Sequence, residues 1–243
     1  MGKSSVTGGL VRLSALLLLL GGMSGAQTAT PDQSQFQSKF AGRDTVLTTN
    51  PESPFWRSAE PVYLQKDITG QPLPESRTTV RSRWTQKYIY FLFECPYKDL
   101  YLKPNPDTSS ETYELWNWNV AEVFLGSDFK NIKRYKEFEI SPQGEWIDLD
   151  VDISKPHHEK GWVWNSGFEH IAKIDRSRQT WYAAVRIPFS ALDTPTPKPA
   201  TEFRVNLFRT EGGPTSVKEI VWRPTMSDTF HVPERFGILR LTK

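Results

Sequence analysis

Alternation of apolar and polar residues with a period of two is the feature that most limits the folds open to this chain. Its clearest instance is Trp146–Ile153, WIDLDVDI, in which aliphatic side chains alternate with aspartates. Such alternation is typical of a β-strand with one buried and one solvated face. No segment after residue 26 carries an apolar stripe with helical spacing, and only PFSALD, residues 188–193, suggests a short helix or turn. The chain is therefore expected to be almost entirely β.

Short β patterns recur from about residue 62 and are separated by turn residues. TTVRSRWT and YIYFLFEC flank Gln86-Lys87 and predict a hairpin. The absence of helices between the patterns excludes βαβ crossovers, so we expect an antiparallel β-sandwich of jelly-roll or immunoglobulin-like type in a single domain. The remaining strand patterns are VAEVFLG, YKEFEISP, EWIDLDVDI, FEHIAKIDR, TWYAAVRIP, EFRVNLFRTE, EIVWRPT and GILRLTK.

Residues 1–26 are interpreted as a secretory signal peptide. Lys3 and Arg12 precede the apolar run Ala15–Leu20, and the small residues Ser24–Ala26 follow it. The apolar run is shorter than the roughly 20 residues that a membrane-spanning helix needs. We therefore expect cleavage near Ala26–Gln27 and a secreted or periplasmic protein, with no membrane contact after cleavage.

The rest of the chain is expected to form an arm and one domain. Residues 27–60 are polar and contain three prolines, so they predict an N-terminal arm that ends by packing Phe55 and Trp56. Residues 61–243 are expected to form the sandwich. Cys95 is the one cysteine, so the core must hold without an internal disulfide.

Charge argues against nucleic acid as a partner. Removing residues 1–26 removes two basic side chains and no acidic one, which leaves 28 of each sign. A neutral surface gives no electrostatic reason to bind nucleic acid or an anionic membrane.

The segment Glu114–Gly126, ELWNWNVAEVFLG, combines large rings with a carboxylate. If it is extended from Trp116 onward, Trp116, Trp118 and Glu122 share one face. The C–H face of a sugar stacks on an indole, and its hydroxyls hydrogen-bond strongly to carboxylates, so this face suits a saccharide. The alternative is that both tryptophans fill the core and Glu122 pairs with an arginine.

Five segments in this order resemble the family 9 carbohydrate-binding modules, within the broader group of DOMON-type sandwiches. The resemblance covers roughly residues 60–243 and implies binding rather than catalysis. The segments are LWNWNVAEVFLG, YKEFEISPQGEWIDL, WYAAVRIPFSAL, FRVNLFR and VWRPTMSDTFHVPERFGILRL.

The resemblance implies a saccharide clamped between two tryptophans. Trp116 matches the first of them, with the sugar-binding glutamate six residues later at Glu122, and Trp222 matches the second. Trp118 is an additional ring that would enlarge or replace this platform. Arg209 and Arg223 are further candidate contacts from this sequence alone. Modules of the family that the chain resembles are usually appended to a glycosidase, and the sequence identifies no such partner.

No cofactor is expected to be required, but the resemblance implies a structural calcium ion. Asp148, Asp150 and Asp152 are the candidate ligands. Residues on one face of a straight strand lie about 6.8 Å apart, so three such carboxylates chelate one ion only if the strand bends. A solvated acidic face is the alternative.

Two rival functions remain open. A glycoside hydrolase needs two carboxyl groups about 5–9.5 Å apart, which Glu122 with Glu137 or Glu139 would supply if their strands pair. The alternative for Glu137 and Glu139 is a solvated strand face. A haem b-binding electron-transfer domain needs axial ligands. The candidates for those ligands are His157, His158, His170, His231 and Met226.

Overall fold

The computed structural model describes residues 1–2, 35–155, 159–194 and 196–243. The chain divides into two units, Met1–Pro31 and Asp32–Lys243, and the fold described below is that of the second. Apart from residues 1–2, the signal peptide predicted for residues 1–26 lies outside the described residues. No helix in the described part of the chain combines the length and hydropathy that crossing a membrane requires.

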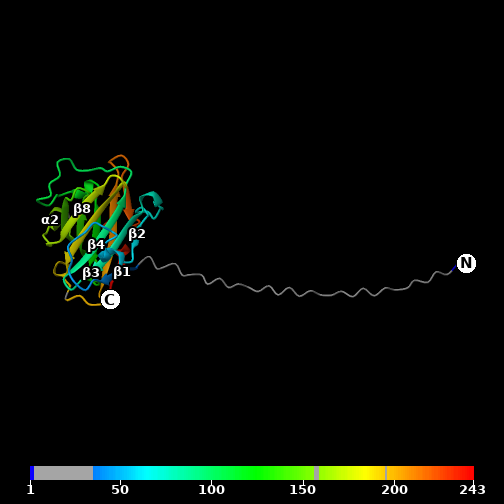
Figure 1. The fold of residues 1–243 in the computed structure, drawn as a ribbon, viewed down its shortest axis with the longest axis horizontal. Coiled ribbons are helices and arrows are strands. Elements are labelled where there is room, and N and C mark those ends of the chain that lie inside the picture. The colour runs from blue at the N-terminus through cyan, green and yellow to red at the C-terminus, as the bar shows by residue number, and fades with distance from the viewer. Residues whose placement is uncertain (3–34, 156–158, 195) are drawn as a thin grey trace. The chain divides into compact units, whose positions relative to one another are not determined.

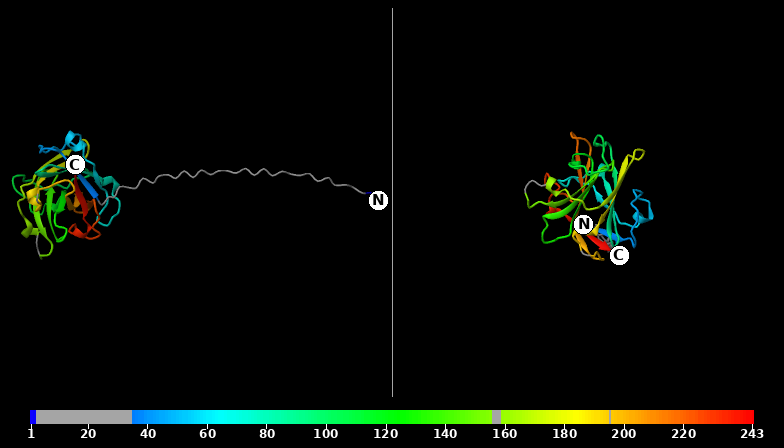
Figure 2. Two further views of the ribbon diagram at one scale, coloured as in Figure 1. Left: turned by 90° about the horizontal axis from the view of Figure 1, so that it is seen from below. Right: turned by 90° about the vertical axis from the view of Figure 1, so that its left-hand side faces the viewer.

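The second unit is an all-β sandwich, as the alternation predicts. Its strands follow the order β7-β6-β5-β10-β12-β1-β3-β4-β9-β8, with β11 beside β10 and β2 beside β3. Figures 1 and 2 show these strands in two facing layers. The strands are β1 (Gln35–Phe40), β2 (Val62–Leu64), β3 (Thr78–Trp84), β4 (Tyr88–Pro96), β5 (Ala121–Gly126), β6 (Arg134–Ile140), β7 (Trp146–Asp152), β8 (Glu169–Asp175), β9 (Thr180–Pro188), β10 (Glu202–Glu211), β11 (Lys218–Val221) and β12 (Gly237–Thr242).

In the part of the chain that the structure describes, helices are confined to single turns. The predicted turn at PFSALD is a short 3-10 helix, and the predicted hairpin is β3 paired with β4 in antiparallel register. The helical elements are α1 (Pro54–Arg57), η1 (Pro74–Ser76), η2 (Leu115–Asn117), α2 (Glu159–Trp162), η3 (Phe189–Leu192) and η4 (Pro233–Arg235).

The main core lies between the two layers. Val123 and Leu125 of β5 face Phe91 and Phe93 of β4 in one cluster of buried side chains. Alternate residues of β4, Tyr90 and Leu92, are also buried, because α1 covers the outer face of their sheet. Both faces of β4 are therefore buried, which explains why apolar residues follow one another without alternation in YIYFLF.

The boundary of the sandwich differs from the expected one. The predicted arm, residues 27–60, contains β1, which pairs in parallel with β12 and with β3 and so joins the two layers. Phe36 of β1 is 1% exposed and lies in the main core. The sequence predicts an arm here because six residues, QFQSKF, carry too short an alternation to distinguish a strand from a polar linker.

A second apolar cluster covers the outer face of β5, β6, β7 and β10. It contains Phe124, Tyr135, Leu149 and Phe208, one from each of these strands. These residues alternate with those that face the main core. The candidate site described next opens on this outer face.

Candidate functional site

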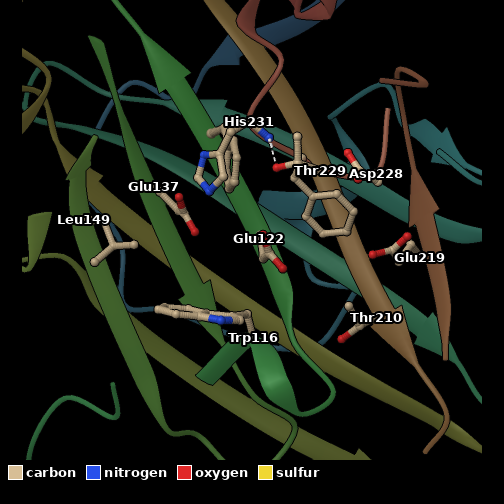
Figure 3. Close-up of a pocket in the computed structure, with 11 residues that line it drawn as sticks. Trp116, Glu122, Glu137, Leu149, Thr210, Glu219, Asp228, Thr229 and His231 are labelled. Carbon is tan, nitrogen blue, oxygen red and sulfur yellow. Dashed lines mark hydrogen bonds between the residues drawn. The ribbon is translucent and has the colours of Figure 1, made fainter. Parts of the chain in front are cut away.

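A pocket of about 270 Å³ lies on the outer face of β5, β6 and β10. Glu122 and Glu137 lie on its floor, and Figure 3 shows Trp116 and His231 on opposite sides of Glu122. The pocket thus combines aromatic walls with carboxyl groups.

Trp116 lines this pocket, but its backbone conformation differs from the extended strand that the sequence predicts. Residues 115–117 form the 3-10 helix η2 rather than an extended strand, because Glu114 adopts a left-handed conformation with φ of 62° and turns the chain. Asn119 then fixes the start of the strand: its side chain accepts from the Tyr101 amide at 2.7 Å and donates to the Gly212 carbonyl at 3.0 Å. The half-buried Trp116 ring packs edge-on against Tyr113, with centroids 5.4 Å apart.

Glu122 lies where the alternation predicts, on the outer face of β5 beside Phe124. Its pairing partner on β10 is Phe208, and the side chain is 1% exposed. Burial raises the pKa of Glu122 well above its usual range, and the nearby carboxyl groups of Glu137 and Glu219 raise it further. The predicted alternative, an arginine partner for Glu122, does not occur among the described ion pairs.

Glu137 and Glu139 of β6 share this outer face. Glu139 lies directly opposite Glu122 in the register of β5 and β6. The expectation that these two glutamates form a solvated face is wrong, since they are 3% and 0% exposed. Desolvation raises the pKa of Glu139, as do the carboxyl groups of Glu122 and Glu137. Loops and η2 cover this face, which strand periodicity alone does not reveal.

The closing loop supplies the aromatic wall opposite Trp116. Phe230 stacks on Phe208 with centroids 4.3 Å apart, and His231 stacks on Phe124 at 5.4 Å. The Tyr135 hydroxyl lies 2.6 Å from Nδ1 of His231 and fixes the ring. Sequence reasoning missed Phe230 in this role, because loop residues follow no period. The signal that was available is its place in the segment that carries the family resemblance.

Trp222 does not face Trp116. It is 7% exposed and lies in the main core, where its ring contacts Phe36 at a centroid distance of 6.0 Å. Val221 pairs with Phe208 and lies in the outer cluster, so the next residue points to the opposite face of the sheet. The expected clamp of Trp116 and Trp222 is therefore not formed, because the two rings lie on opposite faces of one sheet.

Trp118 and the two candidate arginines also lie apart from the pocket. Trp118 stacks on Tyr101 with centroids 4.5 Å apart. Arg209 is fully buried and donates to Thr78 Oγ1 at 2.9 Å, so it binds strands together rather than ligand. Arg223 is tied through its backbone amide to Asn206 Oδ1 at 3.1 Å and does not line the pocket.

The three aspartates of β7 each have partners of their own. Asp148 accepts from the Ser166 amide at 2.9 Å, Asp150 from Lys136 Nζ at 2.7 Å, and Asp152 from the Ser154 amide at 3.2 Å. Asp148 is 1% exposed, so the ladder is not a uniformly solvated face either. Among the described residues, the carboxylates close enough to share one metal ion are instead Glu122, Glu137 and Glu139.

The candidate haem ligands are scattered. His170 packs on Trp146 at a centroid distance of 4.6 Å, and burial lowers its pKa to about 4. His231 lines the pocket whereas the exposed Met226 does not. His157 and His158 lie outside the described residues.

Burial raises the pKa of the Cys95 thiol to about 12, which makes it a poor nucleophile.

Comparisons with known proteins agree with this fold. A carbohydrate binding module family 9 protein from Caldicellulosiruptor kristjanssonii has been solved with cellotriose; its TM-score is 0.62 at 12% identity, over 86% of this chain and 93% of that one. A carbohydrate binding module family 9 protein from the same organism has also been solved with glucose. Its TM-score is 0.61 at 13% identity, over 85% of this chain and 95% of that one. A protein from Bacteroides uniformis ATCC 8492 has a TM-score of 0.67 at 13% identity, over 85% and 98%.

Sequence comparison leads to the family. A protein of Arthroderma benhamiae (strain ATCC MYA-4681 / CBS 112371) described as an extracellular protein is 22% identical over 189 residues, which are 72% of this chain and 82% of that protein. The model of the carbohydrate family 9 binding domain-like family matches residues 52–243, which include nearly every strand of the sandwich and every residue of the pocket. The chain belongs to the carbohydrate family 9 binding domain-like family.

Proposed function

We propose that this chain is an exported, non-catalytic carbohydrate-binding protein whose saccharide occupies the pocket beside Trp116 and Glu122. The observation that carries the proposal is the partly exposed Trp116 ring beside a floor of carboxyl groups. Two relatives of the same fold were solved with glucose and with cellotriose, which supports the same ligand class here. Exported binding of this kind would serve uptake or breakdown of polysaccharides.

The aromatic residues of the pocket would contact the faces of the sugar ring, and its carboxyl groups would contact the hydroxyl groups at the ring edge. Trp116 would stack on the C–H face of a sugar ring, and Phe230 with His231 would close the other side in place of the expected Trp222. Glu122 on the floor and Glu219 and Asp228 at the rim would hydrogen-bond to hydroxyl groups. The site needs no catalytic step and no cofactor for this role.

Calorimetric titration with glucose and cellotriose tests the proposal. Stacking of a nucleic-acid base on an aromatic side chain contributes roughly 1–3 kcal/mol, and the same range is used here for a sugar ring. Trp116→Ala is therefore expected to weaken binding about tenfold to a hundredfold. Trp118→Ala is the matched control, because it removes a half-buried indole outside the pocket and should leave the affinity unchanged.

Two results would contradict the proposal. One is full affinity in a folded Trp116→Ala variant, and the other is an equal loss in both tryptophan variants. The first would move the saccharide away from this pocket, and the second would mean that the variants act through the fold rather than through contact with the sugar.

Hydrolysis of glycosidic bonds is the second candidate, because β5 and β6 do pair and bring Glu122 and Glu137 into one pocket. Binding is favoured over hydrolysis because the two carboxyl groups project side by side from paired strands, with oxygens within 4.8 Å of each other, whereas the two carboxyl groups of a glycosidase flank the scissile bond. Product analysis of cellotriose incubated with the protein separates the two. We expect no shorter sugar, and its release in the wild type but not in Glu122→Gln would establish catalysis.

A further inference from the structure

The pocket beside Trp116 is lined by acidic side chains, and no lysine or arginine of the described chain lines it. The carboxyl groups belong to Glu122, Glu137, Glu219 and Asp228. Figure 3 shows Glu219 and Asp228 on the same side of Glu122. A cleft lined by one sign of charge concentrates ligands of the opposite sign and repels those of its own sign.

The lack of basic residues distinguishes this pocket from a second one, of about 610 Å³. The second pocket is lined by Asp150 and Asp193, and Lys136 Nζ lies 2.7 Å from the first carboxylate and 3.1 Å from the other. Glu219 and Asp228, by contrast, form no ion pair among the described residues. Their carboxylates therefore remain open to a charged group of a ligand.

Glu122 adds a buried acceptor at the floor of the pocket. Its side chain is 1% exposed, and its Oε1 has no hydrogen-bond partner in the described part of the chain. The neighbouring carboxyl groups of Glu137 and Glu139 hydrogen-bond to each other. A buried oxygen without a partner costs free energy, so a ligand that donates a hydrogen bond to it removes that cost. The Glu219 carboxyl group also raises the pKa of Glu122, and a cation beside both would relieve their repulsion.

We propose that the preferred ligand of this pocket is an amino sugar, whose ammonium group binds to the carboxylates of Glu219 and Asp228 and to Oε1 of Glu122. This preference rests on the saccharide binding proposed above and narrows it to one class of sugar. An ammonium group donates three hydrogen bonds and carries the positive charge that the lining residues do not supply. Hydrogen bonds between an ammonium and a carboxylate are roughly twice as strong as those between neutral groups.

The aromatic walls suit the same ligand. Trp116 and Phe230 line the pocket, and an ammonium group near the face of an indole or phenyl ring is attracted by the negative face of the ring. A neutral sugar has only the stacking contact and neutral hydrogen bonds. A uronic acid of similar size meets the same rings, but its carboxylate is repelled by Glu219 and Asp228. Charge therefore separates three classes of sugar that stacking alone does not.

Calorimetric titration with glucosamine, glucose and glucuronic acid tests the preference. It is done at about pH 6, well below the pKa of an α-amino group, so that the amine of glucosamine is protonated. We expect glucosamine to bind about tenfold more tightly than glucose, and glucuronic acid to bind more weakly than glucose. In about 1 M salt the advantage of glucosamine should shrink, because the screening length falls to about 3 Å.

The double variant Glu219→Gln/Asp228→Asn assigns the preference to the pocket. It removes both charges at the rim and keeps the shapes of the side chains, so the ratio of glucosamine affinity to glucose affinity should fall close to one. Glu234→Gln is the matched control, since it removes an exposed carboxylate of the same closing segment that does not line the pocket. It should keep the wild-type ratio. The ratio is taken within each variant, so any loss of affinity that both sugars share cancels.

Equal affinities of the wild type for glucosamine and glucose would overturn the amino-sugar preference without recourse to any variant. Glucose binding that depends on Trp116 would in that case leave the proposed function standing. A preference that persists in the double variant, or that is lost in Glu234→Gln, would also overturn the assignment to this pocket. If none of the three sugars binds, the proposed function and the preference fail together.

Discussion

At the scale of single residues, Arg209 carries a buried charge that the fold requires. Its side chain and that of Glu211 are 0% and 4% exposed, and the guanidinium donates to Glu211 Oε2 at 3.0 Å and to the Pro96 carbonyl at 2.5 Å. Arg209→Met would leave the Glu211 carboxylate buried without its main partner. We expect the free energy of unfolding in denaturant to fall by about 3–5 kcal/mol.

The double variant Arg209→Met/Glu211→Leu serves as the control for this prediction. Removing both charges also removes the cost of desolvating them, so part of the lost stability should return. A single variant as stable as the wild type would mean that the ion pair contributes nothing to folding and that Arg209 is retained for another reason.

Glu111 makes stability depend on pH. Burial, followed by the neighbouring Asp148 carboxylate, raises the pKa of Glu111 from 4.5 to about 7. The folded state thus keeps a proton that the unfolded state releases. Proton binding at Glu111 therefore stabilises the folded state. This stabilisation is fully present below about pH 4.5 and is lost as the pH rises toward about 7.

Glutamine does not titrate. In Glu111→Gln the free energy of unfolding should therefore decline less steeply between about pH 4.5 and about pH 7 than in the wild type. Urea unfolding at a series of pH values measures the slope for both proteins. An unchanged slope in the variant would assign the pH dependence to other buried carboxyl groups.

At the scale of secondary-structure elements, β1 closes the sandwich although it lies before residue 52, where the family match begins. Its backbone pairs with β12 and β3, and Ser38 hydrogen-bonds to Ser82 at 2.8 Å between hydroxyl oxygens. Phe36 alone fills a core position whose truncation costs about 3–5 kcal/mol. A chain that begins at residue 43 should lose at least that much stability.

Thermal unfolding followed by circular dichroism measures the effect of removing β1. A chain that begins at residue 32 is the control and should melt at the temperature of the full chain, because it retains β1. Equal melting temperatures for the two shortened chains would show that β1 is dispensable.

Strand alternation predicted most of the strands, but not β1, and only part of the site, for a physical reason. From Val120 onward the period of two correctly places Glu122 on one face and Val123 on the other. It fails at Trp116, because η2 interrupts the strand, and at Trp222, whose side is fixed by the register of β11 on β10. Register depends on distant strands, and loop positions such as Phe230 follow no period, so neither is readable from a local pattern.

At the scale of the whole molecule, saccharide binding and folding are linked. The strands form one hydrogen-bonded network, so the sandwich is expected to unfold as a single cooperative unit. A ligand that binds only the folded state at a concentration 100 times its dissociation constant stabilises that state by about 2.7 kcal/mol. For a domain of this size the melting temperature then rises by about 5–11 °C.

This linkage gives a binding test that needs no labelled sugar. At a cellotriose concentration 100 times the wild-type dissociation constant, Trp116→Ala should show about half of the shift or less, because the shift follows the logarithm of the ratio of ligand concentration to dissociation constant and that ratio is lower in the variant. Trp118→Ala should show the full shift, since Trp118 stacks on Tyr101 outside the pocket. The comparison is made within each variant, with and without sugar, so any direct effect of the substitution on stability cancels. A full shift in Trp116→Ala would place the stabilising contact elsewhere on the sandwich.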